Sequence, residues 1–376
     1  MRRKPRIKDV AERAGVATST VSYVLNDVAG ARVAAATRER VRAVANELGY
    51  RPNALARALR TQRTHTIGVV SDDVATSPFA SGLIRGAQQA ARRADSLLLL
   101  VNTDDADETC RDVVQALLQR QVDGVVLATM YHRVIDVADE LASVPHVYLD
   151  CRPKSADGAF VVPDEVGGTE AVLTELLEAG HRRIGHLTER RRSVAAGMRL
   201  ATYREVLGRW GVRFDSKLVV ADEPGHVGGW RATGRLLDGP RPPTAVFCFN
   251  DRMAAGAYRA AAERGLVIAK GLSVVGFDDQ QPLAEALWPG LTTAALPHFA
   301  MGEWAVTALL KAVENTGLDG STSGVTMPCD LVRRASVGPP ADVSPRPAPS
   351  TARRRAPSRN APRRQRPHAA AGKDTT

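Results

Sequence analysis

Residues 7–60 read IKDVAERAGVATSTVSYVLNDVAGARVAAATRERVRAVANELGYRPNALARALR, and the organisation of the 376-residue chain follows from this stretch. Its first apolar residues recur with the spacing of one helix face, at Ile7, Val10, Ala11 and Ala14. Gly15 ends this helix, and a second helix is expected to have Thr18 or Ser19 as its cap. The inner face of the second helix consists of Val21, Val24 and Leu25. Helix, short turn with glycine and helix are typical of the helix-turn-helix motif.

A third helix is predicted over 37–48, ending at Gly49, and it completes a small three-helix core. In a helix-turn-helix unit the second helix lies in the major groove of DNA, and its first residues contact base edges. The outward residues of this helix are Thr18, Ser19, Ser22 and Tyr23. Their hydroxyl groups can bond to bases or phosphates, although each taken singly could equally be a cap or surface residue. Together with the turn, the core spacing and the basic flank, they predict DNA recognition.

Residues 53–60, NALARALR, follow Pro52 and form a candidate helix of only about two turns, which would hardly be stable alone in water. The small residues, two arginines and Leu59 of this segment suit insertion into a minor groove, where an apolar side chain can separate base steps. The alternative is a helical linker with Leu59 packed on the next domain.

The formal net charge of +10 is concentrated at the two ends of the chain. Residues 1–64 contain 14 Lys and Arg against 5 Asp and Glu, and residues 339–376 contain 9 against 2, which leaves the middle at −6. A mildly acidic body with two basic ends favours a polyanionic partner, and nucleic acid ranks well above a membrane surface.

Nothing in the sequence predicts a disulfide framework, a metal site or export. The four cysteines are far apart and show no CxxC or Cys/His ligand spacing: Cys110, Cys151, Cys248 and Cys329. The basic start runs into a helical pattern without an apolar leader, and the longest apolar run, 96–101, has the length of a strand. We expect a cytoplasmic protein with no membrane contact, no metal and no cofactor.

From Thr66 onward, short apolar runs alternate with amphipathic helical stretches. The first series has strands at 66–71, 96–102, 123–128 and 146–150 and helices at 79–93, 108–120 and 133–141. The second has strands at 160–164, 183–188, 218–222, 245–251 and 272–279 and helices at 167–179, at 195–210 and up to residue 264. Such alternation builds parallel sheets with helices on both faces. Two series predict an α/β body of two lobes, with a ligand between them at the carboxyl ends of the strands.

The motifs IKDVAERAGV, STVSYVLN, TRERVRAVANELGYRPN and ALARALR resemble the DNA-binding head of the lactose-repressor (LacI/GalR) family. The resemblance implies that Thr18, Ser19 and Tyr23 read an operator half-site, with Thr20 and Ser22 close to backbone phosphates. It also implies a hinge helix that orders on operator DNA and enters the minor groove. The hinge residues expected at the DNA are Asn53, Ala56, Arg57 and Leu59, the last as the wedge.

The head departs from the family pattern at three places. The loop Asp27 to Ala36 is longer than is common in the family. Ala34 stands where a Ser or Thr cap is expected before the third helix, and losing such a cap costs about 1 kcal/mol. Tyr23 occupies a position often filled by Arg, which leaves the base preference there open.

The body resembles the regulatory part of the same family, which is similar to periplasmic sugar-binding proteins, through about residue 338. Carried over position by position, the resemblance implies these effector-binding residues: Ser77, Phe79, Asp150, Arg199, Asn250 and Asp278. Arg, Asn and Asp together suit a polyhydroxylated ligand, because they donate to and accept from adjacent hydroxyls. Asn250 could instead cap the following helix, and Asp278 could cap a turn.

Pro224 and Leu296 stand where the family has an aromatic stacking residue and a Gln, so a standard hexose is less well matched. His226 could take over part of the stacking or polar role, or be a surface residue.

Residues 339–376 are rich in Pro, Ala, Ser and Arg and are predicted to be disordered. Their arginines could raise non-specific DNA affinity, or the segment could be a spacer. The predicted chain therefore has an all-α helix-turn-helix domain (1–50), a hinge helix and linker (51–64), a two-lobed α/β effector-binding and dimerisation domain (65–338) and this basic tail.

The sequence thus predicts a sequence-specific transcriptional repressor. It would bind a palindromic double-stranded DNA operator as a homodimer, under the control of a small sugar-like effector. A binding or transport protein is the second hypothesis, but export would need a signal peptide. An α/β enzyme is the third, and no Ser/His/Asp order, HExxH motif or phosphate-binding loop supports it.

Overall fold

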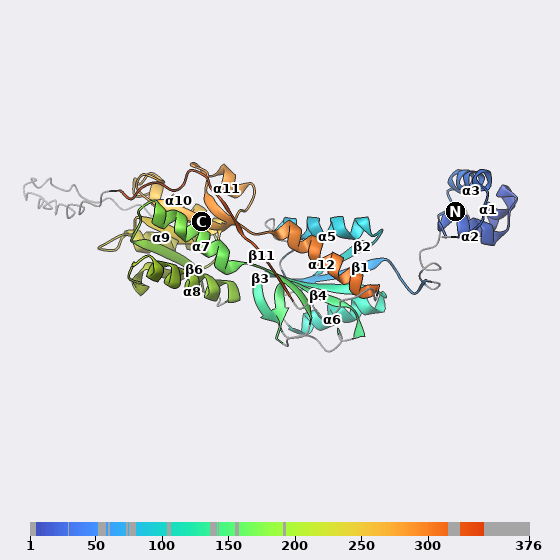
Figure 1. Cartoon of the computed structure of the whole chain (residues 1–376), viewed down its shortest axis with the longest axis horizontal. Helices are drawn as coiled ribbons and strands as arrows, with labels where there is room; N and C mark the ends of the chain where they lie inside the picture. Colours follow the sequence, from blue (N-terminus) through green and yellow to red (C-terminus); the bar gives the residue numbers. More distant parts are fainter. Residues whose placement is uncertain are drawn as a thin grey trace, which may run out of the picture. The chain divides into compact units, whose positions relative to one another are not determined.

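The computed structural model describes most of the head and body of this protein (Figure 1). The described residues are 5–28, 30–51, 58, 61–72, 74, 80–103, 107–135, 141, 143–154, 158–190, 193–314 and 324–341, without the side chains of 107–110.

The head consists of three helices, α1 (Ile7–Ala14), α2 (Thr18–Leu25) and α3 (Ala35–Leu48). They enclose a core of small and β-branched side chains: Val10, Ala11, Ala14, Val21, Val24, Val41, Val44 and Ala45. Helices α1 and α3 end at glycines in the left-handed conformation, Gly15 at φ 64° and Gly49 at φ 67°, as the sequence predicted. The predicted helix-turn-helix fold is confirmed.

Two predicted helix starts in the head differ from the structure. Helix α2 begins at Thr18 after Ala17, and no side chain caps it, so the prediction that Thr18 or Ser19 is the cap is wrong. Ala17, with an extended backbone at φ −68° and ψ 152°, is the N-cap residue of α2. Thr18 and Ser19 therefore lie inside the first turn of the helix. Helix α3 starts at Ala35, two residues earlier than predicted, and Ala34 precedes it without a side-chain cap.

The long loop before α3 is held by two arginines of that helix. Arg38 donates to the carbonyl oxygens of Val33 at 3.2 Å and Ala31 at 2.8 Å. Arg42 pairs with Asp27 at 2.6 Å, although both side chains are largely exposed. The carbonyl contacts from Arg38 replace part of the local order that a capping hydroxyl would have provided.

The first lobe is built on a six-stranded parallel sheet in the order β11-β5-β4-β3-β1-β2. Its strands are β1 (Thr66–Ser71), β2 (Leu97–Asn102), β3 (Gly124–Ile135), β4 (His146–Pro153), β5 (Ala159–Pro163) and β11 (Val325–Met327). Helices α5 (Ser81–Arg93) and α12 (His298–Val313) pack side by side on one face, and α6 (Asp107–Gln119) covers the other (Figure 1).

The second lobe repeats this plan with a six-stranded sheet in the order β12-β10-β9-β8-β6-β7, in which only β12 is antiparallel to its neighbour. Its strands are β6 (Ile184–Glu189), β7 (Val219–Asp222), β8 (Ala245–Cys248), β9 (Ser273–Asp278), β10 (Thr292–Ala295) and β12 (Asp330–Val332). Helices α7 (Glu165–Glu178) and α8 (Val194–Arg209) cover one face, and α9 (His226–Leu237) and α10 (Asp251–Ala262) cover the other. Short elements complete the lobe: the 3₁₀ helix η3 (Ser216–Leu218) and helix α11 (Leu283–Ala286).

The chain passes between the lobes where it leaves β5 for α7, where it leaves β10 for α12, and where it leaves β11 for β12. Each passage is short. The two elements that it connects are two positions apart at the first passage (163 to 165) and three positions apart at the other two (295 to 298 and 327 to 330). The predicted α/β body of two lobes is confirmed, and the connections bring the carboxyl ends of several strands of both sheets to one boundary.

The predicted helix over 133–141 is wrong at its start. Strand β3 continues to Ile135, and Arg133–Ile135 pair with Cys151–Pro153 after a shift of register beyond Ala128. The spacing of Val134, Val137 and Leu141 imitates a helix face, but Val134 and Ile135 are β-branched and the extended β4 offers them a partner.

Helix α9 was not predicted, because its Gly228-Gly229 pair lowers helix propensity. These glycines allow α9 to lie close to its neighbours, since a Cβ on Gly229 would stand 2.1 Å from the carbonyl oxygen of Met253 in α10. Tertiary packing, and not local helix propensity, therefore makes this segment helical.

Candidate functional site

A cavity lies between the lobes, where strands of both sheets end. The first lobe contributes residues 130–132 of β3, Asp150 of β4 and Pro163 at the end of β5. The second contributes the starts of α7, α8 and α10 and the residues that follow β9 and β10. This is the place in a parallel α/β fold where ligands bind.

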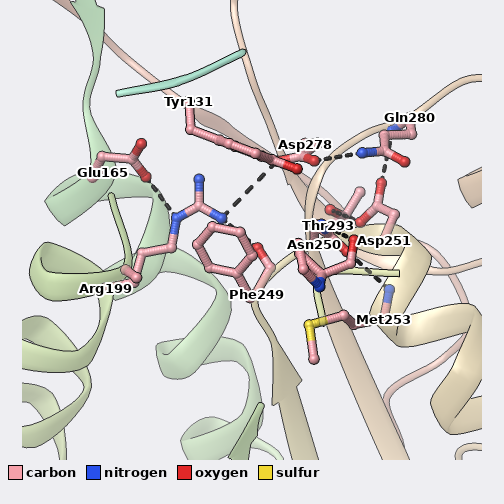
Figure 2. Close-up of polar contacts among 12 residues, drawn as sticks. Tyr131, Glu165, Arg199, Phe249, Asn250, Asp251, Met253, Asp278, Gln280 and Thr293 are labelled. Atoms are coloured by element: carbon pink, nitrogen blue, oxygen red, sulfur yellow. Dashed lines mark hydrogen bonds and ion pairs between the residues drawn. The ribbon is translucent and has the colours of Figure 1, made fainter. Parts of the chain in front are cut away.

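Arg199 of α8 is the centre of the charged groups of this cavity (Figure 2). Its Nε lies 2.6 Å from Oε2 of Glu165, its Nη1 lies 4.0 Å from Oδ1 of Asp278, and it also donates to the carbonyl oxygen of Phe249. Its guanidinium carbon stands 3.6 Å from the ring centre of Phe277 and 4.6 Å from that of Phe249. Ion pair and cation–π contacts thus hold a guanidinium that is almost fully buried.

The environment of Arg199 fixes its charge. Burial by itself disfavours the cation, but the nearby carboxylates of Glu165 and Asp278 outweigh it and raise the pKa of Arg199. The guanidinium therefore stays positive and orients both carboxylates from one helix position.

Asp278 ends β9 with a φ of 110°, and it connects Arg199 to the α10 side of the cavity. Nε2 of Gln280 donates to its Oδ2 at 2.6 Å (Figure 2). Burial raises the pKa of Asp278 to about 7, although Arg199 and Arg252 act in the opposite direction. This carboxyl group is therefore easier to protonate than an exposed aspartate.

A hydrogen bond between described residues joins the two lobes at the cavity. Nη2 of Arg252, in the first turn of α10, donates to the hydroxyl of Tyr131 on β3 at 2.7 Å. The ring of Tyr131 also lies 5.9 Å from that of Phe249. A ligand that changes the position of Tyr131 would therefore change how the lobes meet.

Asp150 has a φ of 58° and is 3% exposed, and its main-chain oxygen accepts from Thr129 at 2.9 Å. Burial, reinforced by Glu165, raises the pKa of Asp150 well above its usual range. His132, on the neighbouring strand, is 2% exposed, and burial lowers its pKa to about 4. This side of the cavity therefore presents a carboxyl group and a neutral imidazole.

Asn250 is part of the helix start and does not line the cavity. Its Oδ1 accepts from the backbone nitrogen of Met253 at 2.9 Å, and its Nδ2 donates to the carbonyl oxygen of Pro224 at 3.1 Å. Asp251 beside it is fully buried and accepts from Thr293 and from the backbone of Gln280, both at 2.7 Å (Figure 2). Among the described contacts, Asn250 acts as a cap.

The structure brings together three of the predicted effector residues, Asp150, Arg199 and Asp278. Ser77 and Phe79 lie outside the described residues. Leu296 lines the cavity, whereas His226 is exposed at the start of α9.

The sequence does not predict six further polar residues of the lining, namely Tyr131, His132, Glu165, Arg252, Gln280 and His298. Three of them had a usable signal, since Glu165, Arg252 and Gln280 directly follow predicted strands. Tyr131 and His132 lie between the predicted strand 123–128 and the wrongly predicted helix, in a segment for which the sequence predicts no site.

The second candidate site is the outward face of α2. Thr18 and Ser19 in its first turn are exposed, Tyr23 is 43% exposed, and Thr20 and Ser22 are partly buried. Asn26 donates to the backbone and hydroxyl oxygens of Ser22 at 2.8 and 3.3 Å. The hinge residues Asn53, Ala56, Arg57 and Leu59 lie outside the described residues.

Among the described residues, no group of three or more His, Cys, Asp or Glu could hold a metal ion. The described cysteine side chains, at Cys151, Cys248 and Cys329, are free and buried. No helix in the described part of the chain has the length and apolarity needed to cross a membrane.

Comparison with known proteins finds matches to both the head and the body. Residues 6–53 match the model of bacterial regulatory proteins of the lacI family, and residues 173–337 match that of the periplasmic binding protein-like domain. The ribose operon repressor of Escherichia coli K12 is 34% identical over 82% of this chain and 92% of its own length. The repressor PurR of Vibrio atlanticus is 32% identical over 88% and 98%.

A solved structure matches most of the chain. The lac repressor dimer bound to operator and the anti-inducer ONPF aligns with a TM-score of 0.74 and 27% identity, covering 89% of this chain and all of that one. Its alignment includes head and body together.

Proposed function

Because this chain belongs to the lacI family of bacterial regulatory proteins, we propose that it is an effector-controlled transcriptional repressor. The observation that carries this proposal is that curated repressors match the chain over both head and body. A DNA-reading unit and a ligand-binding unit in one chain form a regulator whose DNA affinity depends on the ligand.

We place the DNA interface on the first turn and outward face of α2. Thr18, Ser19 and Tyr23 would contact base edges, and Thr20 and Ser22 would lie near phosphates. The exposure of Thr18, Ser19 and Tyr23 supports this assignment, since their side chains are available to a groove. The hinge, with Asn53, Ala56, Arg57 and Leu59, would contribute minor-groove contacts.

We propose that the repressor acts as a homodimer on a palindromic operator. One recognition helix per chain reads one half-site, so two-fold symmetry of the protein requires two-fold symmetry of the DNA. The lac repressor structure, a dimer on its operator, supports this proposal.

The effector would bind in the cavity between the lobes and contact Asp150, Arg199 and Asp278. A sugar or related polyol suits these groups, which donate to and accept from hydroxyls. Support comes from the ribose operon repressor among the relatives. Ser77 and Phe79 remain proposed contacts from the family pattern, whereas Asn250 would act through the placement of α10.

Effector binding would change the relation of the two lobes, for which the bond between Arg252 and Tyr131 is one sensor. That change would alter the spacing of the hinge segments, roughly 51–64, and thereby the DNA affinity. Residues 1–50 and 65–338 are then the DNA-binding and effector-binding domains. Residues 339–376 would be an accessory basic segment.

We assign no enzymatic activity to the chain, since its relatives are regulators and its charged cavity residues are arranged for binding. A repressor acts at the chromosome, so we place the protein in the cytoplasm, at the nucleoid when it is bound to DNA.

The proposed DNA recognition is tested by selection of duplexes from a random-sequence library by the full-length chain. We expect enrichment of a two-fold symmetric sequence, bound with an affinity that falls steeply as salt rises, because phosphate contacts release counterions. Enrichment of no sequence, or of one without symmetry, would refute the proposed dimeric reader. The variant Ser19→Glu is the matched negative control. Its carboxylate at the start of α2 should be repelled by the DNA, so this variant should enrich no sequence.

A further inference from the structure

Asp123 fixes the point at which the chain enters the first lobe. The backbone nitrogens of Thr64 and His65 donate to its carboxylate at 2.7 and 2.8 Å. The hydroxyl of Thr64 also donates to the carbonyl oxygen of Gln121 at 2.7 Å. Asp123 directly precedes β3. The linker from the head is therefore held at the edge of the first sheet where its strands start.

His181 fixes the point at which the chain leaves the second lobe. This residue is 1% exposed, and its Nε2 lies 2.9 Å from the carbonyl oxygen of Gly338. A carbonyl oxygen only accepts, so Nε2 carries the proton and Nδ1 accepts from the hydroxyl of Thr244 at 2.8 Å. The hydroxyl of Ser273 donates to the same carbonyl oxygen at 3.1 Å and accepts from the backbone nitrogen of Gly338 at 3.0 Å. Because Thr244 and Ser273 lie at the starts of β8 and β9, residue 338 is held where strands of the second sheet begin.

These two attachment points lie at opposite ends of the body. Residues from the second halves of β3, β4 and β9 line the cavity between the lobes, so the parallel strands of both sheets run toward it. The edges at which these strands start therefore face away from each other. In the proposed repressor, operator DNA bound by the head is tethered to the first lobe through residues 51–64, whereas residues 339–376 begin at the far end of the second lobe.

Residues 339–376 have the chemistry of a phosphate-binding segment. Eight arginines lie between residues 346 and 366, and this interval contains no Asp or Glu. Guanidinium groups contact phosphates through paired hydrogen bonds, and the release of counterions favours these contacts. The segment has no Trp, Tyr, Phe, Leu, Ile or Met, so it offers neither rings that stack on bases nor large apolar side chains for a lipid surface. Its composition therefore favours the backbone of duplex DNA without sequence preference.

The point of departure determines which polyanion these arginines meet. To contact the operator, residues 339–376 would have to run back along both lobes, and ordering so many residues costs conformational entropy. A duplex beside the second lobe requires no such path. The body itself carries a net charge of only −6 over its 274 residues (65–338), whereas duplex DNA carries one negative charge per about 1.7 Å of its axis. A second duplex is therefore a stronger partner than the body.

We propose that residues 339–376 bind the phosphates of a second DNA duplex, so that a protein held on its operator by the head bridges two DNA segments. This inference rests on the proposed function for the first duplex only. The second contact needs no operator sequence, and its strength depends on the arginines and on the salt concentration.

The first test measures bridging by the full-length protein. The selected operator duplex is immobilised, the protein is bound to it, and a labelled duplex of unrelated sequence is then added. We expect the labelled duplex to be retained, and its retention to fall steeply between about 50 and 200 mM salt, because each phosphate contact releases counterions. Operator-bound protein that retains no labelled duplex at the lower salt concentration would overturn the proposal.

The second test removes charge from the segment by five substitutions, namely Arg353→Gln, Arg354→Gln, Arg355→Gln, Arg363→Gln and Arg364→Gln. This five-arginine variant should bind the labelled duplex at least about tenfold more weakly and keep its operator affinity within about threefold. Retention equal to that of the wild type would assign the second contact to another part of the protein. A loss of operator affinity without a loss of bridging would assign the arginines to the operator. Either result would refute the proposal.

A matched control places the same number of glutamines in the same segment but keeps its charge. Its substitutions are Ala348→Gln, Ala352→Gln, Ala356→Gln, Ala361→Gln and Ala369→Gln. It should retain the labelled duplex as the wild type does, because every arginine is still present. A loss of bridging equal to that of the five-arginine variant would contradict a contact made by charge.

A transfer of the segment tests the importance of the exit point. In this variant residues 342–376 stand before Met1 instead of after Ala341, and the contacts of Gly338 are kept. The arginines then lie close to the operator duplex, so operator affinity should rise by about tenfold or more, and retention of the labelled duplex should fall to that of the five-arginine variant. Undiminished bridging would show that the opposed attachment points do not determine the partner.

Competition identifies the class of polyanion. Unlabelled duplex of unrelated sequence should displace the labelled duplex at a concentration of charge at least about tenfold lower than polyglutamate, because its phosphates are more densely spaced and pair with guanidinium groups. Equal competition by polyglutamate would identify an acidic protein surface as a partner of equal rank and would refute the assignment to DNA.

The proposed repressor and the proposed bridge fail separately. A chain that selects a palindromic duplex but retains no second duplex refutes the bridge and leaves the repressor intact. A chain that selects no palindromic duplex refutes the repressor. In that case, weaker binding of unrelated duplex by the five-arginine variant still supports the DNA contact of residues 339–376, and unchanged binding refutes it.

Discussion

Arg199→Met is expected to lower the free energy of unfolding by about 3–5 kcal/mol, which is the usual cost of leaving one member of a buried ion pair without its partner. Glu165 is 1% exposed, and its Oε2 lies 2.6 Å from the Nε of Arg199. The variant would also lose the contacts to the rings of Phe249 and Phe277, and a ligand that needs the guanidinium would no longer bind. Denaturant unfolding of the purified full-length protein measures the first effect, and sugar titration measures the second.

Arg209 on the same helix provides the control. It pairs with Glu170 at 2.8 Å, but both side chains are nearly half exposed and screened by solvent, so Arg209→Met should lower the free energy of unfolding far less than Arg199→Met. Adding Glu165→Gln to Arg199→Met should restore part of the lost stability, because the unpaired charge is then removed. Equal unfolding free energies for the two arginine variants would show that the buried ion pair does not hold the cavity.

Replacing both Ser19 and Tyr23 with Ala should lower the affinity for the selected operator by roughly 10- to 100-fold, since base contacts are worth about 1–3 kcal/mol. Affinity for duplexes of unrelated sequence should change little, because it depends on basic side chains and phosphates. The exposure of both side chains, 43% for Tyr23, makes a loss of head stability small by comparison. Fluorescence anisotropy with labelled specific and unrelated duplexes measures both affinities under one salt condition.

Asn46→Ala serves as the control for this pair, because Asn46 is exposed on α3, outside the proposed reading face. It should leave both affinities unchanged. A double Ala variant that loses specific and non-specific binding to the same extent would argue against base reading by α2.

Much of the fold could be predicted because periodicity and turn residues agree with tertiary structure. Gly15 and Gly49 end their helices in the left-handed conformation, and Thr66–Ser71 form a strand with the predicted bounds. Where the sequence was misleading, packing overrode local propensity. Helix α9 tolerates its two glycines because Gly229 allows close approach to α10 and Gly228 allows close approach to the backbone of Glu223.

The candidate site could be predicted only where it coincides with a family pattern. Asp150, Arg199 and Asp278 were named and line one cavity. His132 and Tyr131 could not be found, because their position depends on the register shift in β3, a long-range pairing with β4 that no local pattern encodes. The cavity forms where the two sheets meet, so its geometry depends on contacts between residues that are far apart in the sequence. The spacing of residues along the chain predicts little of it.

The central claim is that ligand binding in the cavity and DNA binding by the head are coupled. The most direct measurement is the affinity of the full-length chain for the selected palindromic duplex, with and without a saturating neutral sugar that raises its melting temperature. Coupling between the sites predicts a change of about 5- to 150-fold. A decrease identifies the sugar as an inducer, and an increase identifies it as a corepressor. An affinity that stays the same within about twofold at saturation would contradict the account.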